Sequence, residues 1–377
     1  MPSLSFDAEA TKPHYKYLQI ELTNRCNLAC NTCLRAVPDG VLHEQDLSQS
    51  ALQQLKPTLQ HTSVVHLQGW GESMLLTDLP ERIRWFKVQG CKVSFTTNGS
   101  LMTTRQAAEL VASGLDSITF SMAGASASLQ DSLRGKGSHA KLWQSMQLLR
   151  EAKQQQESET PAMAVSYLLT RETIKELPLA VKGCHPLGLS LFAGVHLTHP
   201  ATSEQEAMRL YPLSRKNSFK RLIRRAHWYA FWGGMRLQLP AFQPDLTPIC
   251  DKNPLAGCFI AADGAVAPCV FLYPPTPVVV NDENHIVENS HQLAVPRKSF
   301  GFLHEESLDH IWHKAEYRNF RKVFKRRLDI YNKEIGRVGC GMDAFAKLDL
   351  TRSRIRKVFK RIPVPDCCRN CPKMEGY

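Results

Sequence analysis

Hydrophobic and polar positions follow two alternating patterns between Tyr15 and Thr198. Short runs rich in β-branched and aromatic residues are followed by longer segments whose apolar residues recur at helical spacing. Alternating strands and helices predict parallel βαβ units, and six such units fit a partial (β/α)6 TIM-like barrel of the α/β class. The expected strands are 17–23, 64–69, 92–98, 117–122, 164–169 and 191–197. The expected helices among them are 47–60, 79–90, 103–114 and 141–155.

The alternation stops after the sixth expected strand. Two helical segments, 203–211 and 217–232, are separated by Pro212, and a turn-rich region begins at Ile249. A basic helix is expected over 308–328. We therefore expect three parts, which are a barrel over 1–199, a helical linker over 200–248 and a small α+β extension over 249–377. Functional residues of such barrels gather at the C-terminal ends of the strands.

Composition favours an ordinary globular protein. Of the 377 residues, 43% are hydrophobic and 22% are charged. Charge or proline interrupts every apolar run near membrane length, which argues against a membrane-spanning helix. The first seventeen residues lack the basic, apolar and small-residue regions of a signal peptide. The sequence therefore predicts a cytoplasmic protein without a membrane partner.

The net charge of +12 is concentrated late in the chain. The segment 297–361 contains 18 Lys and Arg residues against 8 Asp and Glu residues. Such an excess attracts acidic peptides, phosphate, nucleic acid or anionic membranes, although a solvated helix surface explains it equally well.

Twelve cysteines need an explanation in a chain without an export signal. Clustered cysteines in a reducing cytosol are more often metal ligands or catalytic thiols than disulfides. Three of them lie near the N-terminus, three between Cys250 and Cys269, and three near the C-terminus. This placement predicts two metal-binding groups.

The N-terminal group has the spacing Cys-x3-Cys-x2-Cys directly after the first expected strand, at Cys26, Cys30 and Cys33. Three thiolates can hold three irons of a cubane cluster and leave the fourth iron open for a small chelating molecule. The alternative is a zinc site, which in structural cases is usually closed by four ligands.

This motif resembles that of the radical S-adenosylmethionine (SAM) superfamily. The resemblance implies a 4Fe–4S cluster whose open iron binds S-adenosylmethionine (AdoMet) through its amino and carboxylate groups. One electron then cleaves the sulfonium, and the 5′-deoxyadenosyl radical abstracts hydrogen from a substrate. A flavodoxin- or ferredoxin-type electron donor is implied as well.

The cofactor-binding residues come from the same resemblance. The segment GWGE resembles the family's Gly-Gly-Glu motif, which contacts the methionine amino group, with Trp70 intervening between its glycines. The loop after the third strand, the end of the fourth strand and the following helix match further family positions. The implied AdoMet contacts are Gly69, Gly71, Glu72, Asn98, Ser121 and Arg134.

The C-terminal cysteines resemble the iron–sulfur extension called a Twitch or SPASM-like domain. That resemblance implies a β-hairpin around the turn ADGAV, a helix and one auxiliary 4Fe–4S cluster. Its ligands would be Cys250, Cys269, Cys368 and Cys371. Cys258 could replace Cys250, Cys367 could replace Cys368, and a structural zinc is the alternative to the cluster.

Three cysteines, Cys91, Cys184 and Cys340, are left over and are interpreted as small hydrophobic residues. The segment 329–365, which includes Cys340, is outside the resemblance and is a possible substrate-specific insertion. The histidines show no ligand spacing.

The function expected from these features is radical chemistry on a peptide or protein substrate, with the auxiliary cluster as an electron relay. No catalytic side chain is identified. One alternative is a radical SAM dehydrogenase or maturase acting on a small molecule or cofactor precursor. An alternative of another class, a zinc-binding protein that contacts nucleic acid, is disfavoured by the cluster motif.

Overall fold

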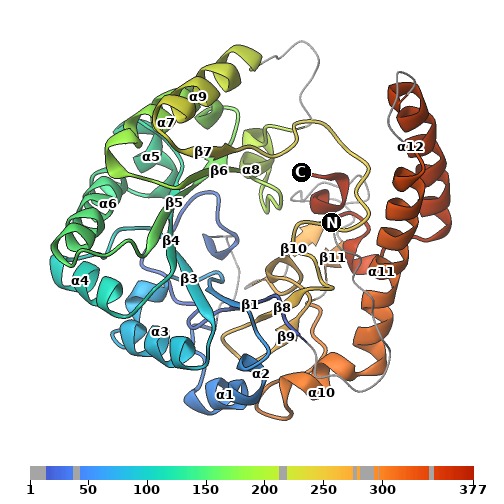
Figure 1. Ribbon diagram of the computed structural model, residues 1–377, viewed down its shortest axis with the longest axis horizontal. Coiled ribbons are helices and arrows are strands. Elements are labelled where there is room, and N and C mark those ends of the chain that lie inside the picture. The colour runs from blue at the N-terminus through green and yellow to red at the C-terminus, as the bar shows by residue number, and fades with distance from the viewer. Residues whose placement is uncertain are drawn as a thin grey trace.

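One open, mostly parallel sheet forms the centre of the protein. The computed structural model describes residues 14–36, 43–211, 219–274, 278–280, 293–295, 297–338 and 344–377. Within them the strand order is β7-β6-β5-β4-β3-β2-β1-β8-β9, and hydrogen bonds do not close the sheet into a barrel (Figure 1). The strands are β1 Tyr17–Ile20, β2 Val64–Leu67, β3 Lys92–Thr97, β4 Ser117–Met122, β5 Ala162–Leu169, β6 Leu191–His196, β7 Arg236–Gln238, β8 Gly257–Ile260 and β9 Val266–Ala267. The six expected strands and the partial-barrel fold are confirmed.

Helices cover the outer face of this sheet (Figure 1). The barrel helices are α1 Gln49–Gln54, α2 Lys56–Leu59, α3 Leu79–Val88, α4 Thr104–Ala112, α5 Ala127–Arg134, α6 Ser138–Gln155 and α7 Thr173–Gly183. Alternate residues of β3 and β4, among them Phe95 and Phe120, are fully buried. The thick α/β core leaves the loops at the C-terminal strand ends to form the site.

The segment 200–248 adds more to the fold than helices. It contains α8 Ser203–Met208, α9 Lys220–Trp232 and strand β7. Strand β7 pairs in parallel with β6, with Leu191 opposite Arg236, and α9 packs beside α7. This part of the chain therefore extends the barrel by a further strand and helix.

The C-terminal extension is joined to the barrel through the same sheet. Strand β8 pairs in parallel with β1, and it returns as an antiparallel hairpin through β9, with Gly264 at a φ of 85° in the turn. A Cβ on Gly257 would overlap the carbonyl oxygen of Tyr17, so only glycine allows these two backbones to approach. The hairpin expected around ADGAV is present.

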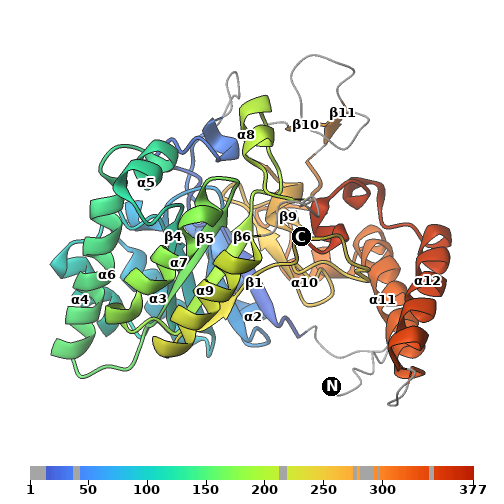
Figure 2. The same cartoon turned by 90° about the horizontal axis from the view of Figure 1, so that it is seen from above.

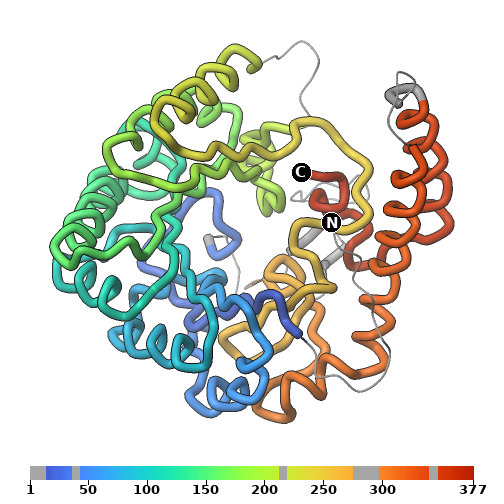
Figure 3. The backbone as a smooth tube through the Cα atoms, viewed as in Figure 1, coloured from blue at the N-terminus to red at the C-terminus, as the bar shows by residue number. Residues whose placement is uncertain are grey.

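Two long helices lie along one side of the molecule, with the C-terminal segment between them and the barrel (Figures 2 and 3). They follow α10 Leu308–His313 and are α11 Ala315–Gly336 and α12 Ala344–Arg361. Strand β10 Val278–Val280 pairs in antiparallel orientation with β11 Leu293–Val295. The Arg327 guanidinium on α11 donates to the carbonyl oxygens of Pro248 and Ile362, at 3.2 and 2.8 Å, which holds the ends of this extension together.

Candidate metal and cofactor site

The first cysteine group lies in the loop that follows β1. Cys26, Cys30 and Cys33 are free thiols and are half-buried. The backbone N–H of Cys33 donates to the carbonyl oxygen of Cys30 at 3.0 Å, which folds the motif into a turn. Burial raises the pKa of the Cys26 and Cys33 thiols, so a bound cation is needed to keep them as thiolates. Three accessible thiols in one turn fit the ligand set of a cluster with one open iron.

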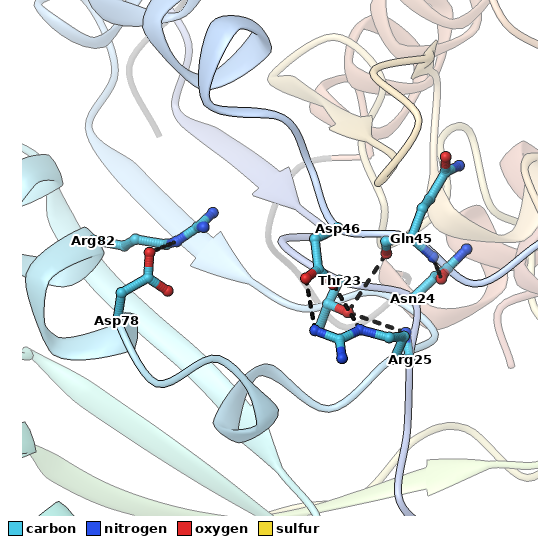
Figure 4. Close-up of polar contacts among 7 residues, drawn as sticks. All are labelled: Thr23, Asn24, Arg25, Gln45, Asp46, Asp78 and Arg82. Carbon is cyan, nitrogen blue, oxygen red and sulfur yellow. Dashed lines mark hydrogen bonds and ion pairs between the residues drawn. The ribbon is translucent and has the colours of Figure 1, made fainter.

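The residues before this loop are anchored to the segment that follows it (Figure 4). Nε and Nη2 of Arg25 donate to the two carboxylate oxygens of Asp46, at 2.9 and 2.6 Å. The backbone N–H of Gln45 donates to Oδ1 of Asn24 at 2.7 Å, and the N–H of Arg25 donates to Oγ1 of Thr23 at 3.1 Å. Side-chain bonds therefore set the path by which the chain enters the cysteine motif.

Glu72 joins three loops at the strand ends. Its Oε1 accepts from the backbone N–H of Met74 at 3.1 Å and from Oγ1 of Thr97 at 2.9 Å, while Oε2 accepts from the N–H of Asn98 at 2.7 Å. Its own N–H donates to the carbonyl oxygen of Arg25 at 2.8 Å. Burial raises the pKa of Glu72, although these donors oppose that shift. Both carboxylate oxygens thus have protein donors, so this side chain organises the loops.

The glycines expected at the cofactor allow close packing at this place. A Cβ on Gly71 would overlap the carbonyl oxygen of Thr23, and one on Gly69 would overlap the side chain of Glu21. Asn98 lies beside the cysteine loop, with its Nδ2 3.9 Å from Sγ of Cys26.

Arg134 and Ser121 lie on the neighbouring elements. Arg134 is the last residue of α5, and its Nε is buried with no hydrogen-bond partner among the described residues. The end of α5 contacts the cysteine motif, because the N–H of Asn31 donates to the carbonyl oxygen of Leu133 at 3.0 Å. The charge of Arg134 also acts on Glu72, and an unpartnered guanidinium N–H is a suitable donor for a carboxylate such as that of AdoMet. Ser121 is half-buried near the end of β4.

The second cysteine group comes from three distant segments. Cys250 precedes β8, and Cys269 follows β9. Cys368 ends the C-terminal turn Asp366–Cys368, and Cys371 directly precedes the turn Pro372–Glu375. Burial, followed by the charge of Cys250, raises the pKa of Cys269 to about 12, and burial and the charges of Cys269 and Cys250 raise that of Cys371 to about 12. The hydrogen bond with Cys367 and burial raise the pKa of Cys368, and the charges of Cys269 and Cys371 add to that shift. The fold therefore brings these four thiols together.

The two alternative ligands occupy different positions. Cys258 on β8 is buried, and after burial its charge is the largest cause that raises the pKa values of Tyr15, Tyr17 and Tyr317. Cys367 is hydrogen-bonded to the Cys368 thiol, which lowers the pKa of Cys367. Cys269 and Cys250 also raise the pKa of Tyr17, so the choice of Cys250 over Cys258 and of Cys368 over Cys367 stays a prediction.

The thiols of each cysteine group lie near one another but do not converge on a site for a single metal ion. In the part of the chain that the structure describes, no three His, Cys, Asp or Glu side chains are close enough to ligate a single ion. A cubane cluster takes one thiolate at each iron, so its ligands surround a space of their own. Of the leftover cysteines, Cys91 and Cys184 are buried elsewhere in the core, and Cys340 lies outside the described residues.

Sequence patterns missed two residues near these groups. His199 follows β6, and its Nε2 lies 3.6 Å from Sγ of Cys371. Loss of water and the charges of Lys373 and Lys252 lower its pKa well below the ordinary value. Its position just after a strand end was the available signal, but a lone histidine has no spacing to recognise.

Glu21, directly after β1, is the second missed residue. Its Oε1 accepts from the N–H of Trp70 at 2.6 Å, and its Oε2 accepts from the N–H of Ala262 at 3.1 Å. Burial raises its pKa to about 7, against the effect of these two donors. A single carboxylate therefore joins the loop after β2 to the C-terminal hairpin.

Comparison with known families agrees with this geometry. Residues 20–181 match the model of the radical SAM superfamily, and residues 250–335 match SPASM, an iron–sulfur cluster-binding domain. The chain contains a radical SAM domain followed by a SPASM domain. The first match includes Cys26, Cys30 and Cys33, while the second ends before Cys367, Cys368 and Cys371.

Two similar proteins match very different shares of this chain. A tungsten-containing aldehyde ferredoxin oxidoreductase cofactor-modifying protein of Pyrococcus furiosus is 25% identical over 319 residues, which are 83% of this chain and 85% of the relative. Mycofactocin maturase MftC of Mycolicibacterium smegmatis is 31% identical over 158 residues, which are 42% of this chain and 38% of MftC.

Two solved structures share the fold of this radical SAM protein. SuiB of Streptococcus suis bound to AdoMet has a TM-score of 0.58 at 14% sequence identity, and the match covers 81% of this chain and 68% of the SuiB chain. The enzyme anSMEcpe with bound AdoMet has a TM-score of 0.58 at 17% identity, over 81% of this chain and 83% of its own. The two family matches, one of them to an iron–sulfur cluster-binding domain, indicate that the protein is an iron–sulfur enzyme. None of its described helices is both long and apolar enough to span a bilayer.

Proposed function

We propose that Cys26, Cys30 and Cys33 hold the 4Fe–4S cluster that binds AdoMet, and that the enzyme abstracts hydrogen from a peptide or protein. The observation that supports this most directly is three free thiols in the loop after β1, together with helix α5, which contacts that loop and ends at Arg134, whose buried Nε has no partner among the described residues. The bound cluster and AdoMet supply reductive cleavage of the sulfonium and the 5′-deoxyadenosyl radical.

The protein's own residues bind and orient the cofactor in this proposal. Arg134 donates to the AdoMet carboxylate, and Ser121 and Asn98 lie at strand ends where they can contact the rest of the molecule. Glu72 is a positioning residue, since its carboxylate is already bonded to Met74, Thr97 and Asn98. The backbone at Gly69 and Gly71 then forms the surface that AdoMet contacts.

The second thiol group holds one auxiliary cluster in this proposal, with Cys250, Cys269, Cys368 and Cys371 as ligands. Four thiolates saturate a cubane cluster, which favours electron transfer over direct substrate binding. A flavodoxin- or ferredoxin-type protein would supply electrons. The functional parts are 1–199, 200–248 and 249–377, even though β7 and β8 share the barrel sheet.

Two observations support a peptide as the substrate. SuiB has been solved with the precursor peptide SuiA, and anSMEcpe with the peptide Cp18Cys. In this chain Arg318, Lys322 and Arg326 are exposed at successive turns of α11, so they form a basic strip. Such a strip attracts an acidic leader segment.

A cofactor precursor is the second candidate substrate. The Pyrococcus furiosus relative is a cofactor-modifying protein, and its match extends over 83% of this chain, twice the share matched by MftC. A match of this extent spans more of the chain than the radical SAM domain alone, which favours a similar substrate.

Metal and product analysis tests the proposal. Protein purified without oxygen should contain about eight irons and show the broad visible absorption of 4Fe–4S clusters. With dithionite and AdoMet it should release 5′-deoxyadenosine, and a true substrate should stimulate that release. Candidates are peptides encoded beside the gene and, for the second function, cofactor precursors. Zinc without iron would refute the proposal, and stimulation by a precursor but by no peptide would establish the second candidate.

A further inference from the structure

A histidine from the barrel lies against the auxiliary thiol group. His199 comes three residues after the end of β6, and its Nε2 lies 3.6 Å from Sγ of Cys371. Its other ring nitrogen, Nδ1, lies 2.8 Å from Oγ1 of Thr198. Both ring nitrogens therefore have a polar neighbour, and one neighbour is a proposed cluster ligand.

The chemistry of the two neighbours decides which nitrogen bears the proton. A cysteine bound to iron is a thiolate, which accepts hydrogen bonds and has no proton to donate. The N–H that faces Cys371 must therefore be on Nε2. A neutral imidazole has one N–H, so Nδ1 accepts from the hydroxyl of Thr198. Thr198, which is buried, selects the tautomer that the contact with Cys371 requires.

Aromatic packing fixes the orientation of the ring. His199 stacks on Phe271 with 4.1 Å between ring centroids and 12° between planes. Phe271 also makes an edge contact with Trp70, with centroids 6.2 Å apart, and Nε1 of Trp70 donates to the carbonyl oxygen of Tyr273 at 3.1 Å. Trp70, which separates Gly69 from Gly71, therefore packs against Phe271, and Phe271 in turn fixes the ring of His199 beside the second thiol group.

We propose that His199 donates a hydrogen bond to the Cys371 thiolate and thereby raises the reduction potential of the auxiliary cluster. The inference rests on the proposed function, in which Cys371 ligates that cluster. Reduction adds negative charge to the cluster and its sulfurs, so an N–H aimed at one of them stabilises the reduced form more than the oxidised form. The first group has its own donor, the Asn98 amide, whose Nδ2 lies 3.9 Å from Sγ of Cys26, so a change at His199 acts on the auxiliary cluster alone.

The test is a potentiometric titration of the reconstituted full-length enzyme, followed by electron paramagnetic resonance. The auxiliary signal is identified in a background with Cys26→Ala, Cys30→Ala and Cys33→Ala, which leaves the second group intact. His199→Phe keeps a ring on Phe271 and removes the donor. It should shift the equilibrium of the auxiliary cluster about tenfold towards the oxidised form, which is about 59 mV for one electron. Thr198→Val removes the hydroxyl that favours the Nε2–H tautomer but keeps the imidazole, so it should give a smaller shift of the same sign.

His196→Phe is the matched control, since it replaces the histidine that ends β6, three residues before His199, and whose Nε2 is bonded to the carbonyl oxygen of Ala241. It should leave the potential unchanged. An unchanged potential in His199→Phe with full iron content would overturn the inference and leave the proposed function standing. If His199→Phe loses its auxiliary iron, Thr198→Val decides, and an unshifted potential there overturns the inference too. Absence of auxiliary iron in the wild-type enzyme would instead defeat the proposed function, and this inference with it.

Discussion

The two cysteine groups are built in opposite ways. Cys26, Cys30 and Cys33 belong to one short loop after β1, whereas the second group combines segments near Cys250, Cys269 and the last turns of the chain. The first group needs only a strand end and the correct spacing. The second forms only after β8 has paired with β1 and the helices α11 and α12 have returned the chain. A local motif and an assembled site therefore serve the same kind of cofactor.

This difference predicts that the first group can be removed without loss of the second. Cys30→Ala should reduce AdoMet cleavage to background, because the loop then offers two thiolates for a cluster that needs three. The auxiliary iron, about four atoms, should remain. Iron analysis and chromatography of 5′-deoxyadenosine measure both effects.

Cys184→Ala is the control for that experiment, since Cys184 is a buried core thiol distant from both groups. It should keep both clusters and the cleavage activity. Retained cleavage in purified Cys30→Ala would show that the ligand assignment is wrong.

The assembled group makes a second, finer prediction at two adjacent cysteines. Cys368→Ala should lose the auxiliary iron, because Cys368 lies close enough to Cys269 and Cys371 for their charges to raise its pKa. Cys367→Ala should keep most of it, since the contact of Cys367 is with Cys368. Iron content and visible spectra compare the pair, and the reverse result would transfer the ligand role to Cys367.

The same contrast explains what could be predicted from sequence. The barrel strands and the first group follow from local period and spacing, and both lie where the pattern places them. The choice between Cys250 and Cys258 does not follow from the sequence, because it depends on which face of β8 meets the terminal turns. Glu21 and His199 were missed for the same reason, since each is a single polar residue whose partners are distant in the chain.

Tertiary contacts also changed an expected helix. The segment 308–328 was predicted as one helix, but it breaks between α10 and α11 at Lys314, whose φ and ψ are −53° and 139°. Nζ of Lys314 bonds to the carbonyl oxygen of Phe300 at 2.9 Å and to the carboxylate of Glu306. These partners lie in the loop before α10, so helical propensity alone could not reveal the break.

Glu21 joins the loop after β2 to the C-terminal hairpin, and its titration provides a third prediction. Its pKa is about 7 in the folded protein, so it keeps a proton there that the unfolded chain loses near pH 4.5. Stability should therefore fall as the pH rises from about 4.5 to 7, by roughly 3 kcal/mol for this group. Glu21→Gln, which does not titrate, should lack this loss. Urea unfolding of cluster-free protein between pH 5 and 8 measures the difference.

Glu176→Gln is a control of opposite sign. Burial alone would raise the pKa of Glu176, but hydrogen bonds from Ser126 and Ala125 lower it overall. Its contribution is present above the unfolded pKa and is lost as the pH falls through the folded value. If wild-type and Glu21→Gln curves run parallel above pH 5, the carboxyl is ionised throughout and the linkage is absent.

The smallest expected effect concerns how the first loop is anchored. The Arg25–Asp46 pair is bidentate, but its side chains are 41% and 36% exposed, so water competes for both. Asp46→Asn should therefore cost about 0.5 kcal/mol of unfolding free energy and leave AdoMet cleavage within error. Urea unfolding at low and high salt measures it, and the difference should shrink as salt screens the charges. A marked loss of the first cluster in this variant would show that the entry path, as well as the cysteine spacing, determines the first site.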